Sequence, residues 1–200
     1  MKKRKSKCFC CERFFDFTKC LLEELRKKGS DTMQFQTKMK ALRILENEHM
    51  LIRSLLHEWY QIMMDVKATE AMLSKYHKLK LLKEKVTEFL PILDKHQSKE
   101  ERFFFPVLGS YIGTDQGPIL TIEAEHDEMA QYFNHFIGVT NMMELSVEDI
   151  NLLLNDLNEG YEICMVHMYK EESVLFTMAE KVFKIKDEEM LLEALNTKII

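Results

Sequence analysis

The chain is organised around Asp94-Lys95-His96-Gln97-Ser98-Lys99-Glu100-Glu101-Arg102-Phe103-Phe104-Phe105-Pro106 and around a later copy of it, His167-Met168-Tyr169-Lys170-Glu171-Glu172-Ser173-Val174-Leu175-Phe176. Each copy contains His-x-x-Lys-Glu-Glu followed by apolar residues. On a helix, side chains at positions i and i+4 lie on one face, one turn apart. The imidazole and the first carboxylate of each copy therefore have the spacing of a pair of metal ligands.

A second motif also occurs twice. Glu46-Asn47-Glu48-His49 and Glu123-Ala124-Glu125-His126 share the pattern Glu-x-Glu-His. Along the chain the order is His, His-x-x-x-Glu, His, His-x-x-x-Glu. This order indicates two copies of a helix pair, which together offer four imidazoles and two carboxylates.

Composition favours a helical protein. The 200 residues fit one domain, or one domain with an appendage, and only six are Gly and three Pro. The net charge of −5 argues against a nucleic-acid partner, because such domains normally carry a basic excess. There is no nucleotide-binding Gly-rich loop and no Ser/His/Asp signature, which makes nucleotide or hydrolase chemistry unlikely to be the function.

The sequence predicts no membrane association. No stretch approaches about 18 uncharged apolar residues, the length that would span a bilayer. The basic start, Lys2 to Lys7, is followed by a segment that charges interrupt before an apolar run forms, so it does not match a secretory signal. We therefore expect a cytoplasmic protein.

Two regions differ in character. Residues 1–32 form a Cys-containing N-terminal extension, which could be loosely ordered, and residues 33–200 form the expected metal-binding bundle. Four of the five cysteines lie in the extension, at Cys8, Cys10, Cys11 and Cys20. They could hold zinc or a cluster, although they match none of the usual paired Cys-x-x-Cys spacings.

Apolar residues at alternating steps of three and four predict four long helices. The first begins near Thr37. The second runs from about Thr69 to Ser110, with Pro91 expected to break or kink it. The third begins at Pro118, and the fourth follows a capping-box-like Ser146-Val147-Glu148-Asp149. With a last short helix from near Asp187 to Ile200, the sequence predicts an all-α, antiparallel up-and-down four-helix bundle with short extra helices at the termini.

The inward-facing seams of these helices contain polar residues where leucine would be expected. His49 and His126 lie in the seams of the first and third helices. The second seam is predicted to contain Leu93, His96, Glu100, Phe103 and Val107. The fourth is predicted to contain Ile150, Leu153, Leu157, Gly160, Cys164, His167, Glu171, Val174 and Met178.

Two carboxylates in a dry core indicate bound cations. An ionised carboxylate costs several kcal/mol to bury unless it is paired or bound to metal, and the seams offer no lysine or arginine able to neutralise both. Imidazole nitrogen beside carboxylate oxygen suits iron, manganese or zinc. Four imidazoles and two bridging carboxylates give each of two ions two nitrogens and two oxygens. A shared oxo or hydroxo group would be a fifth ligand, which leaves a sixth position open for a small molecule.

At these motifs the sequence resembles the hemerythrin-like (HHE cation-binding) family of di-iron four-helix bundles, over about residues 37–183. The resemblance implies two iron ions held by His49, His96, Glu100, His126, His167 and Glu171, with Glu100 and Glu171 as bridging carboxylates. It also implies affinity for dioxygen or nitric oxide.

The sequence departs from the oxygen-carrying hemerythrins at two places. Their third helix has His-x-x-x-His, whereas Ala130 stands four residues after His126. Their last helix has His-x-x-x-x-Asp, and Glu172 stands at that place here. The set of four His and two Glu is more similar to bacterial proteins implicated in repairing damaged iron-sulfur centres. Those proteins carry an N-terminal Cys-Cys pair, to which Cys10-Cys11 is the nearest counterpart.

Three functions remain open. The first, which we favour, is a non-enzymatic di-iron module that binds or senses dioxygen or nitric oxide, with a redox partner as a further expectation. The second is an enzyme or repair protein that donates iron to damaged clusters or reduces oxygen, peroxide or nitric oxide. The third is iron or zinc handling without gas chemistry.

Several other polar residues are not expected to be ligands. His57, His77 and His135 are predicted to lie on helix flanks, in solvent or at a bundle end. Glu101 and Glu172 lie one helix step, about 100°, from the ligand carboxylates, and are predicted to flank the site or to accept a hydrogen bond from an imidazole N–H. The same role is open to Glu48 and Glu125. Tyr161 and Tyr169 could reach the site, although core packing is the simpler expectation.

Overall fold

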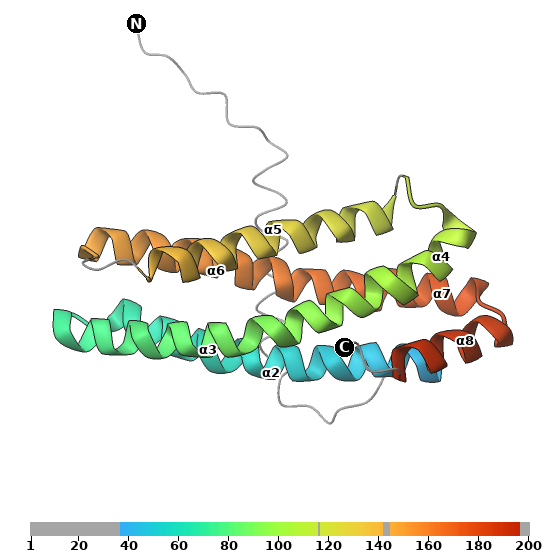
Figure 1. Cartoon of the computed structure of the whole chain (residues 1–200), viewed down its shortest axis with the longest axis horizontal. Coiled ribbons are helices and arrows are strands. Elements are labelled where there is room, and N and C mark those ends of the chain that lie inside the picture. The colour runs from blue at the N-terminus through green and yellow to red at the C-terminus, as the bar shows by residue number, and fades with distance from the viewer. Residues whose placement is uncertain (1–36, 116, 142–144, 197–200) are drawn as a thin grey trace, which may run out of the picture. The chain divides into compact units, whose positions relative to one another are not determined.

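A computed structural model describes residues 37–115, 117–141 and 145–196 of the chain. The described residues are almost entirely helical (Figure 1). The predicted extension, residues 1–32, lies outside them and stays a prediction, as does any role for Cys10-Cys11.

Four long helices form the bundle. The first hairpin pairs α2 (Lys40–Ala68) with α3 (Met72–Lys99), and the second pairs α5 (Pro118–Val139) with α6 (Val147–Lys170). Contacts of α2 with α6 and of α3 with α5 close the ring of four. The predicted all-α up-and-down bundle is confirmed (Figure 1).

Two of the long helices continue beyond a π-helical turn. In the first hairpin, α3 passes into η1 (Glu100–Phe104) and then α4 (Phe105–Ile112). Likewise α6 passes into η2 (Glu171–Leu175) and α7 (Phe176–Val182). A last helix, α8 (Ile185–Asn196), packs against α2 and η1. It begins two residues before the predicted Asp187, and the predicted end at Ile200 lies outside the described residues.

The helix ends follow local chemistry. At the start of α6, the Ser146 hydroxyl accepts from the Asp149 N–H at 3.1 Å, and the Asp149 carboxylate accepts from the Ser146 N–H at 2.9 Å. This confirms the predicted capping box. Pro118 occupies the first turn of α5, where its missing N–H costs nothing. Pro91 does not break α3, which runs through it to Lys99.

The predicted seams of α2 and α5 are buried as expected. The α2 seam comprises Leu42, Leu45, His49, Ile52, Leu56, Trp59 and Met63, and the α5 seam comprises Ile119, Ile122, His126, Met129, Phe133 and Phe136. The histidines therefore lie between apolar layers on both sides along each helix.

Beyond the two buried carboxylates, the predicted seams are wrong by one residue. After Glu100 the fully buried residues are Phe104 and Leu108, not Phe103 and Val107, which are only partly buried. The cause is the π-helical turn, which inserts one extra residue into the helical repeat and shifts the buried face by one position.

The same shift occurs after Glu171. Leu175 and Ala179 are buried in place of Val174 and Met178, and Val174 is 43% exposed. Because η2 occupies the equivalent place in the second copy of the motif, both copies deviate from the regular α-helix at the same residue.

Candidate metal centre

The structure brings the six predicted ligand residues together in the middle of the bundle. Each is at most 4% exposed, and they come from all four long helices and from the first residues of η1 and η2. Their donor atoms form two overlapping clusters, within each of which all atoms lie within 4.8 Å of one another. The first cluster contains His49, His96, Glu100 and Glu171, and the second contains Glu100, His126, His167 and Glu171.

We call His49 and His96 the first half-site. His96 Nε2 lies 3.0 Å from Glu100 Oε1. His49 Nε2 lies 3.1 Å from Glu171 Oε2 and 3.7 Å from Glu100 Oε1. Two nitrogens and two carboxylate oxygens therefore converge on one point.

His126 and His167 form the second half-site. His126 Nε2 lies 3.6 Å from Glu100 Oε2, and His167 Nε2 lies 3.5 Å from Glu171 Oε2. The two Nε2 atoms are 3.1 Å apart. Glu100 faces the first half-site with one oxygen and the second with the other, which is the geometry of a carboxylate that bridges two cations.

The outward nitrogen of every site histidine contacts a carboxylate. These four residues, which we call the outer carboxylates, accept from Nδ1 at 2.7–3.2 Å in the pairs His49–Glu172, His96–Glu48, His126–Glu101 and His167–Glu125. An ionised carboxylate only accepts hydrogen bonds, so each Nδ1 carries a hydrogen and each Nε2 is the nitrogen left to bind a cation in the interior. The hypothesis that these four glutamates accept from imidazole agrees with the structure.

The lysine of each His-x-x-Lys-Glu-Glu copy has a role that the sequence did not reveal. Lys99 contacts Glu48, which is the outer carboxylate of His96. Lys170 contacts Glu125, which is the outer carboxylate of His167. Its recurrence at the same place in both copies was the available signal. Each lysine fixes, on a neighbouring helix, the carboxylate that orients its own histidine.

The two half-sites differ at one outer carboxylate. Arg53 Nη2 donates to Glu172 Oε2 at 2.9 Å, and the Glu172 side chain is 9% exposed. The equivalent Glu101 side chain is 46% exposed, and in the described part of the chain its ion pair is with His126. Arg53 stands four residues after His49, where the other copy has Ala130 four residues after His126.

The interior of the site is built for positive charge. Among the described residues, both oxygens of Glu100 and of Glu171, together with Nε2 of His49 and His96, are buried without a hydrogen-bond partner. Burial opposes charge on Glu100, yet the neighbouring His96 and His49 hold its pKa well below the ordinary value. Four inward lone pairs and two buried carboxylates fit two cations, and this mixture of nitrogen and oxygen suits iron, manganese or zinc.

Without a cation, protons must supply the positive charge. Burial by itself would lower the pKa of His49, but the nearby carboxylates of Glu100, Glu171 and Glu172 raise that pKa well above the ordinary value. Burial likewise opposes charge on His96, and Glu100 raises its pKa. Metal ions and protons therefore compete for the same nitrogens.

The π-helical turns place an aromatic ring over a histidine in each half-site. The Phe176 ring is stacked on His49, with 5.7 Å between centroids, and the Phe105 ring on His126, with 6.0 Å. Each phenylalanine stands five residues after a buried glutamate. The backbone N–H of Phe105 donates to the carbonyl oxygen of Glu100, and that of Phe176 donates to the carbonyl oxygen of Glu171. In an α-helix, residues five apart point about 140° away from each other, so both could not face one histidine.

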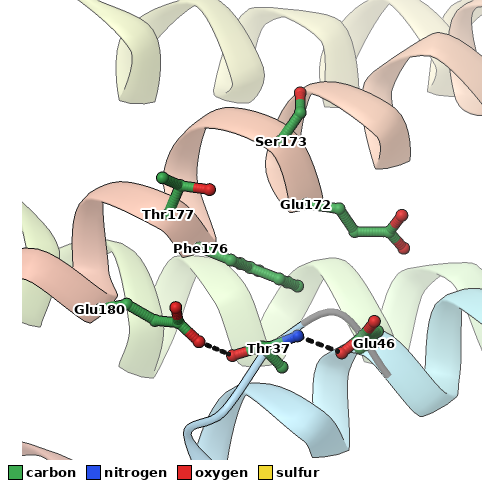
Figure 2. A pocket seen from close by; sticks show the side chains of 7 residues that line it. All are labelled: Thr37, Glu46, Glu172, Ser173, Phe176, Thr177 and Glu180. Atoms are coloured by element: carbon green, nitrogen blue, oxygen red, sulfur yellow. Dashed lines mark hydrogen bonds between the residues drawn. The ribbon is translucent and has the colours of Figure 1, made fainter. Parts of the chain in front are cut away.

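A pocket lies outside the first half-site (Figure 2). Its lining comprises Thr37, Glu46, Glu172, Ser173, Phe176, Thr177 and Glu180. Figure 2 shows Thr37 between two carboxylates: its N–H donates to Glu46 at 3.2 Å and its hydroxyl to Glu180 at 2.7 Å. Two lining side chains, Glu172 and Phe176, contact His49 directly.

The residues that the sequence discounted lie away from the centre. His57 and His77 are exposed, and His135 is exposed beside Asp156 at the flank of α5. Tyr161 packs in the core against Trp59 and Tyr60. Tyr169 is 36% exposed.

Comparison with known families places the chain. The model of the hemerythrin HHE cation-binding domain matches residues 40–179, which include all six converging residues. The chain belongs to the hemerythrin HHE cation-binding domain family. Cation binding is therefore the shared property of the family to which this bundle is assigned, and the buried His/Glu clusters are where this chain can provide it.

The curated relatives of this hemerythrin-type chain are similar to part of it. It is 33% identical over 91 residues to the "Iron-sulfur cluster repair protein YtfE" of Dickeya chrysanthemi (strain Ech1591), covering 44% of this chain and 41% of the relative. It is 30% identical over 98 residues to the protein of that name from Yersinia pestis (strain Pestoides F), covering 47% and 44%. The matches thus span less than half the length of these relatives. No solved structure matched the chain.

Proposed function

We propose that this chain holds two iron ions at a four-His, two-Glu centre. The observation that carries the proposal is the sharing of Glu100 and Glu171 by two clusters, each of which also contains two imidazole Nε2 atoms. Two nitrogens and two oxygens leave coordination positions open on each six-coordinate ion. The chain's own contribution is to fix the imidazoles through the outer carboxylates and to keep water from the ligands by burial.

We propose further that the centre serves iron-sulfur cluster repair, with iron as the cargo it gives up. The relatives that carry this name support the proposal. So does the chemistry of the site: histidines and carboxylates bind ferrous iron without thiolates, and protons compete for the same imidazoles, so that bound iron can be exchanged. Donation of an ion requires no turnover, which leaves the enzyme classification open.

A second candidate is the reversible binding or sensing of dioxygen or nitric oxide. The open coordination positions favour it, since a diatomic molecule needs only one of them. The stacked Phe176 and Phe105 also favour it, because they provide an apolar wall beside the imidazoles. A separate redox partner would be needed to reduce the iron after oxidation.

Metal analysis and optical spectroscopy test the centre itself. Protein loaded with ferrous iron should contain about two irons per chain, and after exposure to air it should show the absorption bands of an oxo- or hydroxo-bridged ferric pair. Dithionite should remove these bands. Fewer than two bound irons, or a colourless protein that takes up only zinc, would contradict the two-iron proposal.

A transfer assay separates the two candidate functions. The iron-loaded chain is mixed anaerobically with an apo iron-sulfur protein, sulfide and thiol, and cluster formation is followed by absorbance. Transfer of iron to the acceptor at a rate above that of free ferrous iron held by a matched chelator supports repair. Retention of the iron with a spectrum that returns after each cycle of gas addition and removal favours gas binding.

A further inference from the structure

The two half-sites have equivalent residues around their histidines, so a difference between their surroundings can explain a difference in how they hold a metal ion. In both halves one histidine is fixed by a partly buried glutamate and lysine, the pairs Glu48–Lys99 and Glu125–Lys170. In both, a phenylalanine ring covers the other histidine. These contacts therefore give neither half an advantage in holding a metal ion.

The difference lies at the outer carboxylates of His49 and His126. Glu172 is held by two partners, the His49 imidazole at 2.8 Å and the Arg53 guanidinium at 2.9 Å, and its side chain is 9% exposed. A partly buried, charge-assisted pair of this kind holds its carboxylate more firmly than a single neutral hydrogen bond does. Glu101 bonds to His126 at 2.7 Å with a side chain that is 46% exposed, so water competes for its oxygens.

A metal ion leaves its position when an imidazole swings away from it. That motion must break the Nδ1–H bond to the outer carboxylate or carry the carboxylate along. In the first half-site Arg53 holds Glu172 in place, so that the carboxylate cannot move with the His49 ring. In the second half-site Ala130 stands at the equivalent position and cannot hold Glu101 in this way. His126 is also slightly more exposed than His49, at 4% against 0%.

We propose that the two cation positions exchange their metal at different rates: the position at His126 and His167 is labile, and the position at His49 and His96 retains its ion because Arg53 fixes Glu172. This inference rests on the proposed two-metal centre. It assigns to Arg53 the role of a positioning residue that acts through Glu172 and His49. In a repair protein, the ion at His126 and His167 would be the one donated, and the retained ion would keep the bundle folded.

The pocket of Figure 2 does not make the first half-site the faster one to release its metal ion. It reaches Glu172 and Phe176, but both of these side chains are engaged with His49. A chelator in the pocket would meet a carboxylate already held by Arg53 and an aromatic ring. The exposed Glu101, by contrast, links solvent to His126 directly.

Metal release from the full chain tests the proposal, with zinc as the probe. The chain is loaded with two equivalents of Zn²⁺ and mixed with excess 4-(2-pyridylazo)resorcinol, and release is followed by absorbance. Two phases are expected, each of about one equivalent. Removing the outer support of a ligand typically changes metal affinity by about 10- to 100-fold, so Arg53→Ala should accelerate the slow phase by a factor in that range and leave the fast phase unchanged.

Two further variants make the test specific. Ala130→Arg places a guanidinium at an exposed position equivalent to Arg53 and should slow the fast phase. Lys85→Ala removes a surface cation that pairs with Glu58, and should alter neither phase. Thr177→Phe narrows the pocket and should also alter neither phase; a slowed fast phase would place the exit route there and overturn the assignment.

Histidine NMR identifies the half-site that empties. With ¹⁵N-labelled histidine, the ring signals of His126 and His167 should return to their metal-free positions after the fast phase, while those of His49 and His96 stay unchanged. Two zinc ions that leave in a single phase, or loss from His49 and His96 first, would overturn this inference alone. Fewer than two bound zinc ions would overturn the two-metal centre on which it rests.

Discussion

At the residue scale, the site histidines use their two ring nitrogens for different tasks. Each Nδ1–H donates to a glutamate from another helix, and each Nε2 points to the shared interior. The ring orientation is therefore set before any cation binds. The exposed His77 has no such carboxylate partner in the part of the chain that the structure describes, and its ring is not restrained in this way.

Removing one site imidazole should lower the number of metal ions bound per chain, whereas removing a surface imidazole should leave that number unchanged. His167→Ala removes one of two nitrogens from the second half-site and leaves the partly buried Glu125 without its imidazole partner. We expect this variant to bind fewer than two irons per chain, measured by elemental analysis after desalting. His77→Ala is the control and should bind as the native chain does. Full metal retention in His167→Ala would refute the ligand assignment.

The metal-free protein should lose stability as the pH rises. The pKa of His49 is raised well above its ordinary value, so its protonation stabilises the fold fully below the unfolded-state pKa, and this contribution is lost as the pH rises through the folded-state pKa. Melting temperatures in chelator should therefore fall as the pH rises above about 6.5, the ordinary pKa of histidine.

The metal-loaded protein is the control for this pH series, because a cation then supplies the charge that the imidazolium supplied. Its melting temperature should not follow the same decline. A metal-free protein whose melting temperature is level or rises across this range would show that the carboxylates do not depend on protonated His49.

At the element scale, the π-helical turns η1 and η2 position the glutamates and phenylalanines of the centre. Each begins at a buried carboxylate and is followed by the phenylalanine that covers a histidine. π-Helical turns are less favourable than α-helical ones and are frequent at functional sites. Their presence at the same residue of both copies links the irregularity to the site and not to general packing.

Deletion of Val174 should separate folding from metal binding. Removing one residue from η2 would restore the α-helical repeat and leave Leu175, Phe176 and Ala179 three, four and seven steps after Glu171, a regular buried face. Because Val174 is 43% exposed, no buried side chain is lost.

We therefore expect the deletion variant to keep its helix content in circular dichroism and its cooperative melting, but to bind fewer than two irons. Val174→Ala is the matched control, since it removes the side chain and keeps the turn. A deletion variant that still binds two irons with the native spectrum would show that the π-helical turn is not needed at the centre.

At the scale of the whole molecule, the centre joins elements that are far apart in the sequence. Its residues come from α2, α3 with η1, α5, and α6 with η2, which are the four members of the bundle. A cation at either position would therefore link helices of both hairpins. In the part of the chain that the structure describes, no helix combines the length and apolar character needed to cross a membrane.

Metal binding should raise the stability of the whole bundle. A ligand that binds only the folded state, at a free concentration a thousand times its Kd, adds about 4 kcal/mol to the free energy of unfolding. For a chain of this size the melting temperature should then rise on the order of 10 °C. Calorimetry of the native chain with and without ferrous iron checks this. In the Glu100→Ala variant, which lacks one of the two buried carboxylates, the rise should be much smaller; an equal rise would mean that the metal stabilises the protein elsewhere.

The sequence by itself determined the bundle and the six converging residues. Apolar seams at steps of three and four carry enough information for that, because a helix places residues by a fixed rotation, and a histidine or glutamate in a seam must point inward. The repeated Glu-x-Glu-His and His-x-x-Lys-Glu-Glu motifs added the pairing, and the glutamates next to the ligands, such as Glu101 and Glu172, could be predicted as partners for imidazole N–H groups.

Only the tertiary structure decided which partner belongs to which histidine and how the two halves differ. The buried faces after Glu100 and Glu171 could not be predicted, since a fixed repeat does not contain the extra residue of a π-helical turn. The pairings of Lys99 with Glu48 and of Arg53 with Glu172 join different helices, and the distance between two side chains on neighbouring helices depends on how those helices pack. Periodicity fixes the direction of a side chain, whereas its neighbour across the bundle is fixed only when the helices are assembled.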